Sequence, residues 1–256
     1  MVVKVSYGRL TPRLVGQLKR AQSTWIVSHS EQLRETRWSQ RALLGIGAAA
    51  VATFDPKRAD MVNALNEVTG VSAAENLHRK MTADPMGKQI LAEKPRLNSK
   101  ILRLSDLEKL EENTLGKKYF NWLKNNGVTP DSREIVRYVV DAETAYVIQR
   151  YREIHDFYHV FLEQDIDLLG ESVVKAFEAA QTGFPMCYLG IIGGVPSIPR
   201  AQRRDYFMRY LPWALHAGKR AKLLLNFKFE DMLKEDFTKL RREMNIVSFG
   251  EWSMNR

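Results

Sequence analysis

The chain has 256 residues, of which 45% are hydrophobic, so it is long enough for one large helical domain with a sizeable core, or for two small domains. Its single cysteine, Cys187, excludes an internal disulfide, and its place in an apolar run favours buried packing over a nucleophilic role. The formal net charge is +9, but the first 30 residues hold five bases and no acid, which leaves 34 bases against 30 acids in the remainder. A body so weakly basic gives no support to nucleic-acid binding.

The first 30 residues form a basic segment that is rich in serine and threonine. Leu10, Leu14 and Leu18 recur every four residues beside basic positions. An acid-free, amphipathic segment of this composition is typical of a mitochondrial transit peptide, whereas a secretory signal needs a long apolar run that is missing here. A disordered basic tail is the alternative. We therefore divide the chain into a transit peptide at 1–30 and a helical domain at 31–256.

No stretch of the sequence reaches the roughly 18 apolar residues that a membrane-spanning helix needs. The longest apolar run, ALLGIGAAAVA at 42–52, has the alanine and glycine content of a buried helix with close neighbours. An integral membrane protein is therefore not expected, and a peripheral membrane role stays open.

Helical periodicity dominates the body, and strand signals are weak. Proline, glycine and capping residues divide the body into successive helices, with Asp141 capping a long one and Asp165 or Asp167 capping the next. We predict an all-α fold in a single helical domain. The expected helices cover 39–54, 56–70, 73–82, 89–93, 105–112, 116–124, 141–162, from 165 or 167 to 183, 201–217 with an interruption at Pro212, and 228–244, while 95–105 and 190–199 are expected to be irregular.

The long helix at 141–162 carries a group of metal-ligating residue types. His155 and His159 stand four apart, Asp156 follows the first histidine, and Glu171 follows the second by twelve. Because an α-helix turns about 100° per residue, His159 and Asp156 lie about 40° and 100° from His155, on one side of the helix. The next helix folds back in a helical hairpin, so Glu171 can face the histidines.

The spacing alone supports a metal site and a hydrogen-bonded polar helix edge about equally. Buried carboxylates and imidazoles need partners, and one divalent cation would satisfy all four side chains at once. Two histidines with carboxylates suit Zn²⁺, and Fe²⁺ or Mn²⁺ equally well.

The same residues carry a resemblance to a known family. The pattern His-Asp-x-x-His, eleven residues, then Glu stands here as HDFYH, VFLEQDIDLLG and E at 155–171. Further ordered blocks are DPKRADMVNALNEVTG at 55–70, DPMGKQILAEKPR at 84–96, AYVIQRYREIHD at 145–156 and GESVVKAFEAAQTGFPMC at 170–187. Over roughly residues 40–245 the sequence resembles the mitochondrial coenzyme Q (ubiquinone) biosynthesis protein four family.

The resemblance implies a fold, an activity and a location. It implies an all-helical protein that binds Zn²⁺, with His155, Asp156, His159 and Glu171 as both metal ligands and catalytic residues. It implies a carbon–carbon lyase that removes the ring carboxylate from 4-hydroxy-3-methoxy-5-polyprenylbenzoate, with or without coupled hydroxylation. It also implies a peripheral protein on the matrix side of the mitochondrial inner membrane, within the multi-subunit coenzyme Q biosynthetic complex; homo-oligomerisation is left open.

The chain departs from the family pattern in the eleven-residue loop. Relatives usually have glycine and then proline where this chain has Glu163 and Asp165. The spacing is kept, so ligation is expected to survive, although either acid could reach the metal. Tyr151, Arg152 and Tyr158 are candidates for assisting the reaction, each with an alternative reading as packing or surface charge.

A polyprenyl tail would need an apolar groove open to a bilayer. Residues 184–192 are expected to line that groove, and an aromatic stretch is expected to meet the membrane interface, unless it is an ordinary core helix with solvated arginines. The stretch comprises Tyr206, Phe207, Tyr210, Leu211 and Trp213, flanked by Arg203, Arg204 and Arg209.

Three other functions fit parts of the pattern. A non-catalytic scaffold would use a structural zinc and present polyprenyl intermediates to other enzymes. A phosphohydrolase that uses the His-Asp doublet would need a further histidine upstream and a further aspartate downstream; His78 and Asp205 could serve, but nothing in the sequence around them supports this. A zinc protease would use His-x-x-x-His but normally has Glu, not the shorter Asp156, beside the first histidine.

Overall fold

The fold is given by a computed structural model that describes residues 24–34, 36–37, 39–40, 43–48 and 59–254. Within these ranges the regular structure is helical, and β-pairing is limited to an isolated bridge between Thr114 and Asp236. The predicted all-α class is therefore confirmed. No helix in this part of the chain is long and apolar enough to cross a membrane.

Most helices follow one another through short connections, the longer connections being 127–141 and 221–236, and residues 24–32 and 43–48 are helical as well. The later α-helices are α3 (Ala59–Thr69), α4 (Val71–Ala83), α5 (Pro85–Glu93), α6 (Ser99–Leu102), α7 (Leu104–Leu107), α8 (Leu115–Asn126), α9 (Ala142–Leu162), α10 (Leu168–Thr182), α11 (Pro185–Gly193), α12 (Arg200–Asp205), α13 (Leu211–Arg220), α14 (Phe237–Glu243) and α15 (Phe249–Met254). A π-helical turn at Tyr206–Tyr210 joins α12 to α13, and 3-10 turns lie at Pro130–Ser132, Val195–Ser197, Leu224–Asn226 and Phe229–Asp231.

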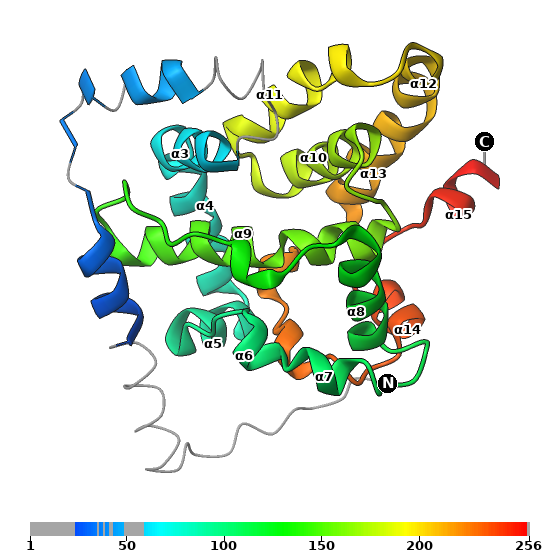
Figure 1. Ribbon diagram of the computed structural model, residues 1–256, viewed down its shortest axis with the longest axis horizontal. Coiled ribbons are helices and arrows are strands. Elements are labelled where there is room, and N and C mark those ends of the chain that lie inside the picture. Colours follow the sequence, from blue (N-terminus) through cyan, green and yellow to red (C-terminus); the bar gives the residue numbers. More distant parts are fainter. Residues whose placement is uncertain (1–23, 35, 38, 41–42, 49–58, 255–256) are drawn as a thin grey trace.

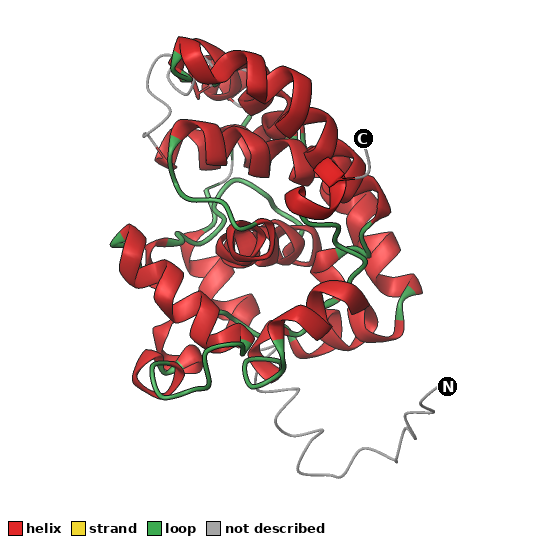
Figure 2. Cartoon of the chain, turned by 90° about the vertical axis from the view of Figure 1, so that its right-hand side faces the viewer, coloured by secondary structure: helices red, strands yellow, loops and turns green. Residues whose placement is uncertain are grey.

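Helix α9 forms the axis of the molecule. It runs across the middle of Figure 1 and is seen end-on, surrounded by other helices, in Figure 2. Every residue from Thr144 to Leu162 is buried. The Asp141 carboxylate accepts hydrogen bonds from the N–H and the hydroxyl of Thr144 at 2.8 and 2.6 Å, which caps the start of α9 as predicted.

A helix buried on all sides must place its charged side chains where opposite charges meet them. Three charged residues of α9 do this with partners from other parts of the chain. The pairs are Arg150–Glu230 at 3.1 Å, Arg152–Glu67 at 2.7 Å and Glu153–Arg96 at 2.5 Å. These ion pairs connect α9 to segments that precede it and to a segment that follows it in the sequence.

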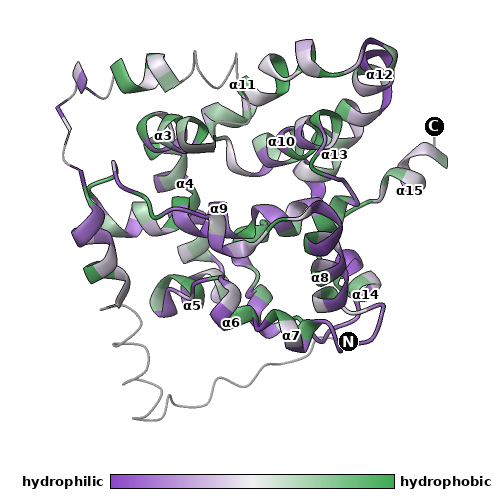
Figure 3. Cartoon of the chain, viewed as in Figure 1, coloured by the Kyte–Doolittle hydropathy of each residue, from purple (hydrophilic) through white to green (hydrophobic). Residues whose placement is uncertain are grey.

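Helix α10 follows α9 and packs closely against α11 and α13, on the upper side of α9 in Figure 1. Its start is capped by Asp167, whose carboxylate accepts the Gly170 N–H at 2.7 Å. Gly218 of α13 lies so near α10 that an added Cβ would sit 2.6 Å from the Phe177 carbonyl oxygen. Helix α11 has no charged residue and is predominantly apolar in Figure 3.

The structure corrects several predicted boundaries. Residues 95–105 were expected to be irregular but include α6, which Asn98 caps by accepting the Ile101 N–H at 3.1 Å. The expected helix at 105–112 ends at Leu107, α11 continues to Gly193 inside the expected loop at 190–199, and 228–244 is α-helical only from Phe237. In the last case tertiary packing overrides local preference, because Phe229 is fully buried in a 3-10 turn.

The N-terminal segment is described only from residue 24. Trp25 is buried and donates a hydrogen bond from its indole nitrogen to the Ala142 carbonyl at 3.0 Å, and His29 contacts the Val139 carbonyl at 2.9 Å. Residues 24–32 thus pack on the start of α9. Residues 24–30 belong to the expected transit segment, and the end of that segment at residue 30 stays a prediction. The rest of that segment and the expected helix start at Asp55 lie outside the described residues.

Candidate metal centre

A cavity of about 890 Å³ opens beside α9 and is lined by all four predicted site residues. Helices α3, α9, α10 and α11 form most of its wall. The lining is largely apolar, and includes Val62, Leu65, Trp122, Val128, Ile166, Leu168, Leu169, Met186 and Leu189. An apolar cavity with a small convergent polar group is the usual form of a small-molecule site.

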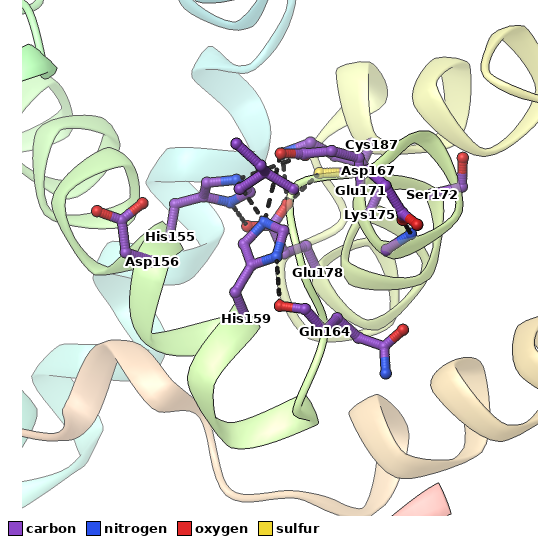
Figure 4. Close-up of polar contacts among 12 residues, drawn as sticks. His155, Asp156, His159, Gln164, Asp167, Glu171, Ser172, Lys175, Glu178 and Cys187 are labelled. Atoms are coloured by element: carbon purple, nitrogen blue, oxygen red, sulfur yellow. Dashed lines mark hydrogen bonds and ion pairs between the residues drawn. The ribbon is translucent and has the colours of Figure 1, made fainter. Parts of the chain in front are cut away.

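Three side chains from the two consecutive helices α9 and α10 converge in this cavity, as Figure 4 shows. The Nε2 atoms of His155 and His159 lie 3.3 Å apart. The Glu171 carboxylate oxygens lie 3.7 Å from the His155 Nε2 and 3.4 Å from the His159 Nε2. One atom from each residue falls within 4.8 Å of the others, which is the spacing of a three-ligand metal site.

The outer nitrogens of both imidazoles contact groups that can only accept a hydrogen bond. The His155 Nδ1 lies 2.7 Å from a Glu178 carboxylate oxygen, and the His159 Nδ1 lies 3.2 Å from the Gln164 carbonyl oxygen. That carbonyl also accepts the Trp122 indole N–H at 2.9 Å. Each Nδ1 must therefore carry the proton, which leaves both Nε2 atoms of the neutral rings with lone pairs that face each other.

These residues fit a divalent metal. With both imidazoles neutral, two Nε2 lone pairs and a carboxylate converge, an arrangement that a cation stabilises. Metal-bound histidines in proteins characteristically donate their second N–H to a carboxylate or a carbonyl, as both histidines do here. Two nitrogens and one or two oxygens are a donor set for Zn²⁺, Fe²⁺ or Mn²⁺, and three protein ligands leave a position open for substrate.

Without a metal, a proton would have to take its place. Burial raises the pKa of Glu171, but contacts with His155 and His159 outweigh burial and hold this pKa well below its usual range. Burial lowers the pKa of His155, yet Glu178 and Glu171 raise it overall. Glu171 is thus an anion at neutral pH, and it requires a positive partner, either a metal or an imidazolium.

Sequence reasoning missed Glu178, which lies behind His155. Its side chain is fully buried, and it accepts hydrogen bonds from Lys175 and Tyr151 at 2.7 Å each, in addition to His155. Burial raises its pKa, but Lys175 and His155 outweigh burial and lower it to about 2. The signal was present, because Glu171, Lys175 and Glu178 follow the i, i+4, i+7 spacing of one helix face.

Asp156 is the predicted ligand that the structure places apart from the other three. It lines the cavity, but its carboxylate pairs with the Arg133 guanidinium and is not among the converging ligand atoms. Figure 4 shows it pointing away from both histidines. Of the loop acids, Glu163 pairs with Arg241 at 3.2 Å and Asp165 is exposed outside the cluster.

The residues expected to assist chemistry have different positions. Tyr151 and Arg152 line the cavity, and Tyr151 donates to Glu178 while Arg152 pairs with Glu67. Tyr158 is fully buried and is not part of the cavity wall.

The expected membrane-facing aromatic stretch is only partly exposed. Tyr206 and Trp213 are fully buried, so they pack in the core and do not meet an interface. Phe207 is exposed, and Leu189 of α11 is exposed at the cavity wall. Phe184, expected in the groove, is fully buried.

The extra ligands of a phosphohydrolase are not assembled. His78 contacts Glu143 at 3.8 Å, Asp205 is exposed, and neither residue lines the cavity. A protease base beside the first histidine is missing as well, because Asp156 points away from the cluster.

The chain is similar to known proteins over most of its length. A family profile described as coenzyme Q (ubiquinone) biosynthesis protein Coq4 matches residues 31–249. The mitochondrial ubiquinone biosynthesis protein COQ4 homolog of Rattus norvegicus is 44% identical over 207 residues, covering 81% of this chain and 78% of that protein. The Bombyx mori homolog is 40% identical over 238 residues and 92% of both chains. A Nostoc punctiforme crystal structure, described as a ubiquinone biosynthesis protein, shares the fold with a TM-score of 0.62 at 20% identity, covering 78% of this chain and 96% of that one.

Proposed function

The chain belongs to the coenzyme Q (ubiquinone) biosynthesis protein Coq4 family, and on this premise we propose that it removes the ring carboxylate of 4-hydroxy-3-methoxy-5-polyprenylbenzoate with the help of a bound divalent metal. The observation that carries the proposal is the convergence of the His155 and His159 Nε2 atoms with the Glu171 carboxylate inside an apolar cavity. The metal would be Zn²⁺, Fe²⁺ or Mn²⁺.

The cavity suits an aromatic acid with an apolar tail. A metal held by these three residues would supply Lewis-acid stabilisation of the negative charge on the substrate oxygens. Trp122, Leu65 and Leu169 on the wall exclude water from the ring, which strengthens every electrostatic contact inside.

Lys175 is the proton donor in this scheme. As carbon dioxide leaves, the electron pair of the broken carbon–carbon bond stays on the ring carbon, which takes up one proton. Burial lowers the pKa of Lys175, but Glu178 raises it overall, so the ammonium on the cavity wall carries a proton at neutral pH. Hydrogen bonds to Glu178 at 2.7 Å and to the Tyr151 hydroxyl at 3.3 Å hold it there.

The tail would leave the cavity past an exposed apolar rim. Ile166, Leu168 and Leu189 line the cavity and are 42%, 38% and 47% exposed, and Ile192 follows one turn later on α11. This rim would rest on the matrix face of the mitochondrial inner membrane, as a peripheral contact within the coenzyme Q biosynthetic complex. The relatives that match over most of the chain are named as mitochondrial proteins.

The test is a decarboxylation assay on purified, metal-analysed protein. Wild type should release carbon dioxide from a short-tailed 4-hydroxy-3-methoxy-5-prenylbenzoate. Glu171→Gln should lose both metal and turnover, whereas Asp165→Asn, which changes an exposed carboxylate of the loop that precedes α10, should keep both. Turnover by metal-free protein would refute the metal role. Tight binding without turnover would favour the alternative of a lipid-presenting scaffold with a structural zinc.

A further inference from the structure

The contacts of Asp156 raise the question of what this buried carboxylate does. Its side chain is 2% exposed and pairs with Arg133, which lies just after the 3-10 turn Pro130–Ser132. A carboxylate that serves a metal must turn its oxygens to the cation, and this one is turned to a guanidinium. Moving it would leave Arg133 without its carboxylate partner in a partly buried position, a costly change.

Arg133 differs from the other cations on the cavity wall. Arg152 donates from both of its terminal nitrogens, to Glu67 and to the carbonyl oxygens of Asn63 and Glu134, and only its buried Nε has no partner among the described residues. Lys175 is held by two partners, as described above. Arg133 instead donates only from Nη2, to Asp156, among the described residues; its Nε also lacks a partner but is buried, as in Arg152, which leaves Nη1 as the spare donor.

An arginine with spare donors on a cavity wall is suited to a carboxylate. A guanidinium presents its N–H groups in a planar fork that matches two carboxylate oxygens. Arg133 lines the same cavity as His155, His159 and Glu171, so an anion bound there would share the cavity with the three converging side chains. We propose that Asp156 is a positioning residue and not a metal ligand: it holds Arg133 in the cavity wall, where the free donors of the guanidinium bind the ring carboxylate of the substrate.

This inference rests on the proposed function for the identity of the carboxylate, so the test separates metal binding from anion binding. The key variant is the double change Arg133→Gln with Asp156→Asn, which replaces the ion pair by two neutral amides that can still hydrogen-bond. Glu153→Gln is the matched control, because Glu153 is a 2% exposed carboxylate of α9 that pairs with an arginine away from the cavity. Glu171→Gln is the reference for loss of a ligand.

The first measurement is metal content after purification. The double variant should retain metal at the wild-type level, as Glu153→Gln should, whereas Glu171→Gln should not. Loss of metal from the double variant, with retention in Glu153→Gln, would overturn the inference and make Asp156 a ligand.

The second measurement is binding of two unreactive probes, 3-methoxy-5-prenylbenzoate and its carboxylate-free counterpart 3-prenylanisole, by titration calorimetry. Wild type and Glu153→Gln should prefer the acid by roughly 10- to 100-fold, the range of hydrogen bonds to a charged group, and the double variant should lose that preference. An unchanged preference in the double variant, or none in wild type, would refute the role of Arg133. Wild type that prefers the acid but holds no metal would instead refute the metal centre and leave Arg133 as the anion site.

Discussion

The buried carboxylate of Glu178 gives the sharpest test of how the site is built. We expect Glu178→Gln to weaken both the fold and the metal site, because the carboxylate orients His155 and neutralises Lys175. Its pKa falls from an ordinary 4.5 to about 2 in the folded protein. At about 1.4 kcal/mol per pKa unit, this corresponds to a stabilisation of roughly 3 kcal/mol, undiminished by solvent because the side chain is fully buried.

The sign of the pH dependence follows from that shift. The unfolded chain binds more protons than the folded one, so the stabilisation is complete above about pH 4.5 and is lost as pH falls toward 2. Urea unfolding of chelator-treated protein should therefore show a gap of roughly 3 kcal/mol between wild type and Glu178→Gln at pH 7, and a narrowing gap below pH 4.5.

The same substitution should lower metal affinity about 10- to 100-fold, the usual cost of removing a partner that orients a metal-bound histidine. Chelator competition measures this affinity directly. Glu153→Gln is the control, since it removes another buried carboxylate of the core outside the cavity and should leave affinity unchanged. A Glu178→Gln variant with wild-type metal affinity would refute the orienting role, and a stability gap independent of pH would refute its electrostatic origin.

Three further substitutions test the fold and the rim. Gly218→Ala should lower the free energy of unfolding by about 1–3 kcal/mol, as measured with urea, because the added Cβ would sit 2.6 Å from the Phe177 carbonyl oxygen of α10. An unchanged urea midpoint would mean that α13 can shift to make room for the added Cβ. Ile192→Asp should reduce binding of the protein to anionic liposomes, whereas Ile101→Asp, which changes an exposed isoleucine of α6, should not. Equal effects of the two substitutions would rule out the rim as the membrane contact. Glu163→Gly should raise Tm, since residue 163 has a φ of 54° that favours glycine, and a lower Tm would show that the exposed ion pair with Arg241 outweighs that strain.

The parts of the fold that sequence predicted were those governed by local chemistry. Asp141 begins α9 and Asp167 begins α10 because a carboxylate satisfies free N–H groups within three residues, whatever the rest of the chain does. The structure of 224–236 could not be read in this way. Its 3-10 turns exist because Leu224, Leu225 and Phe229 fill the core, and that demand comes from helices far away in sequence.

The residues of the site likewise separate into those that local sequence predicts and those that depend on packing against distant segments. Spacing fixes the angle between two side chains of one helix, so His155 and His159 had to lie together, and a short loop brought Glu171 to them. Spacing does not fix which neighbour each side of the helix meets. Asp156 stands about 100° from His155 around the helix, and at that angle its carboxylate could face either a metal or a side chain from another segment. In the structure it faces Arg133, which lies outside the helix. A motif therefore predicts metal ligands securely for residues that face the next helix, α10. For a residue about a quarter-turn away around α9, ligation depends on which side chains pack on that side.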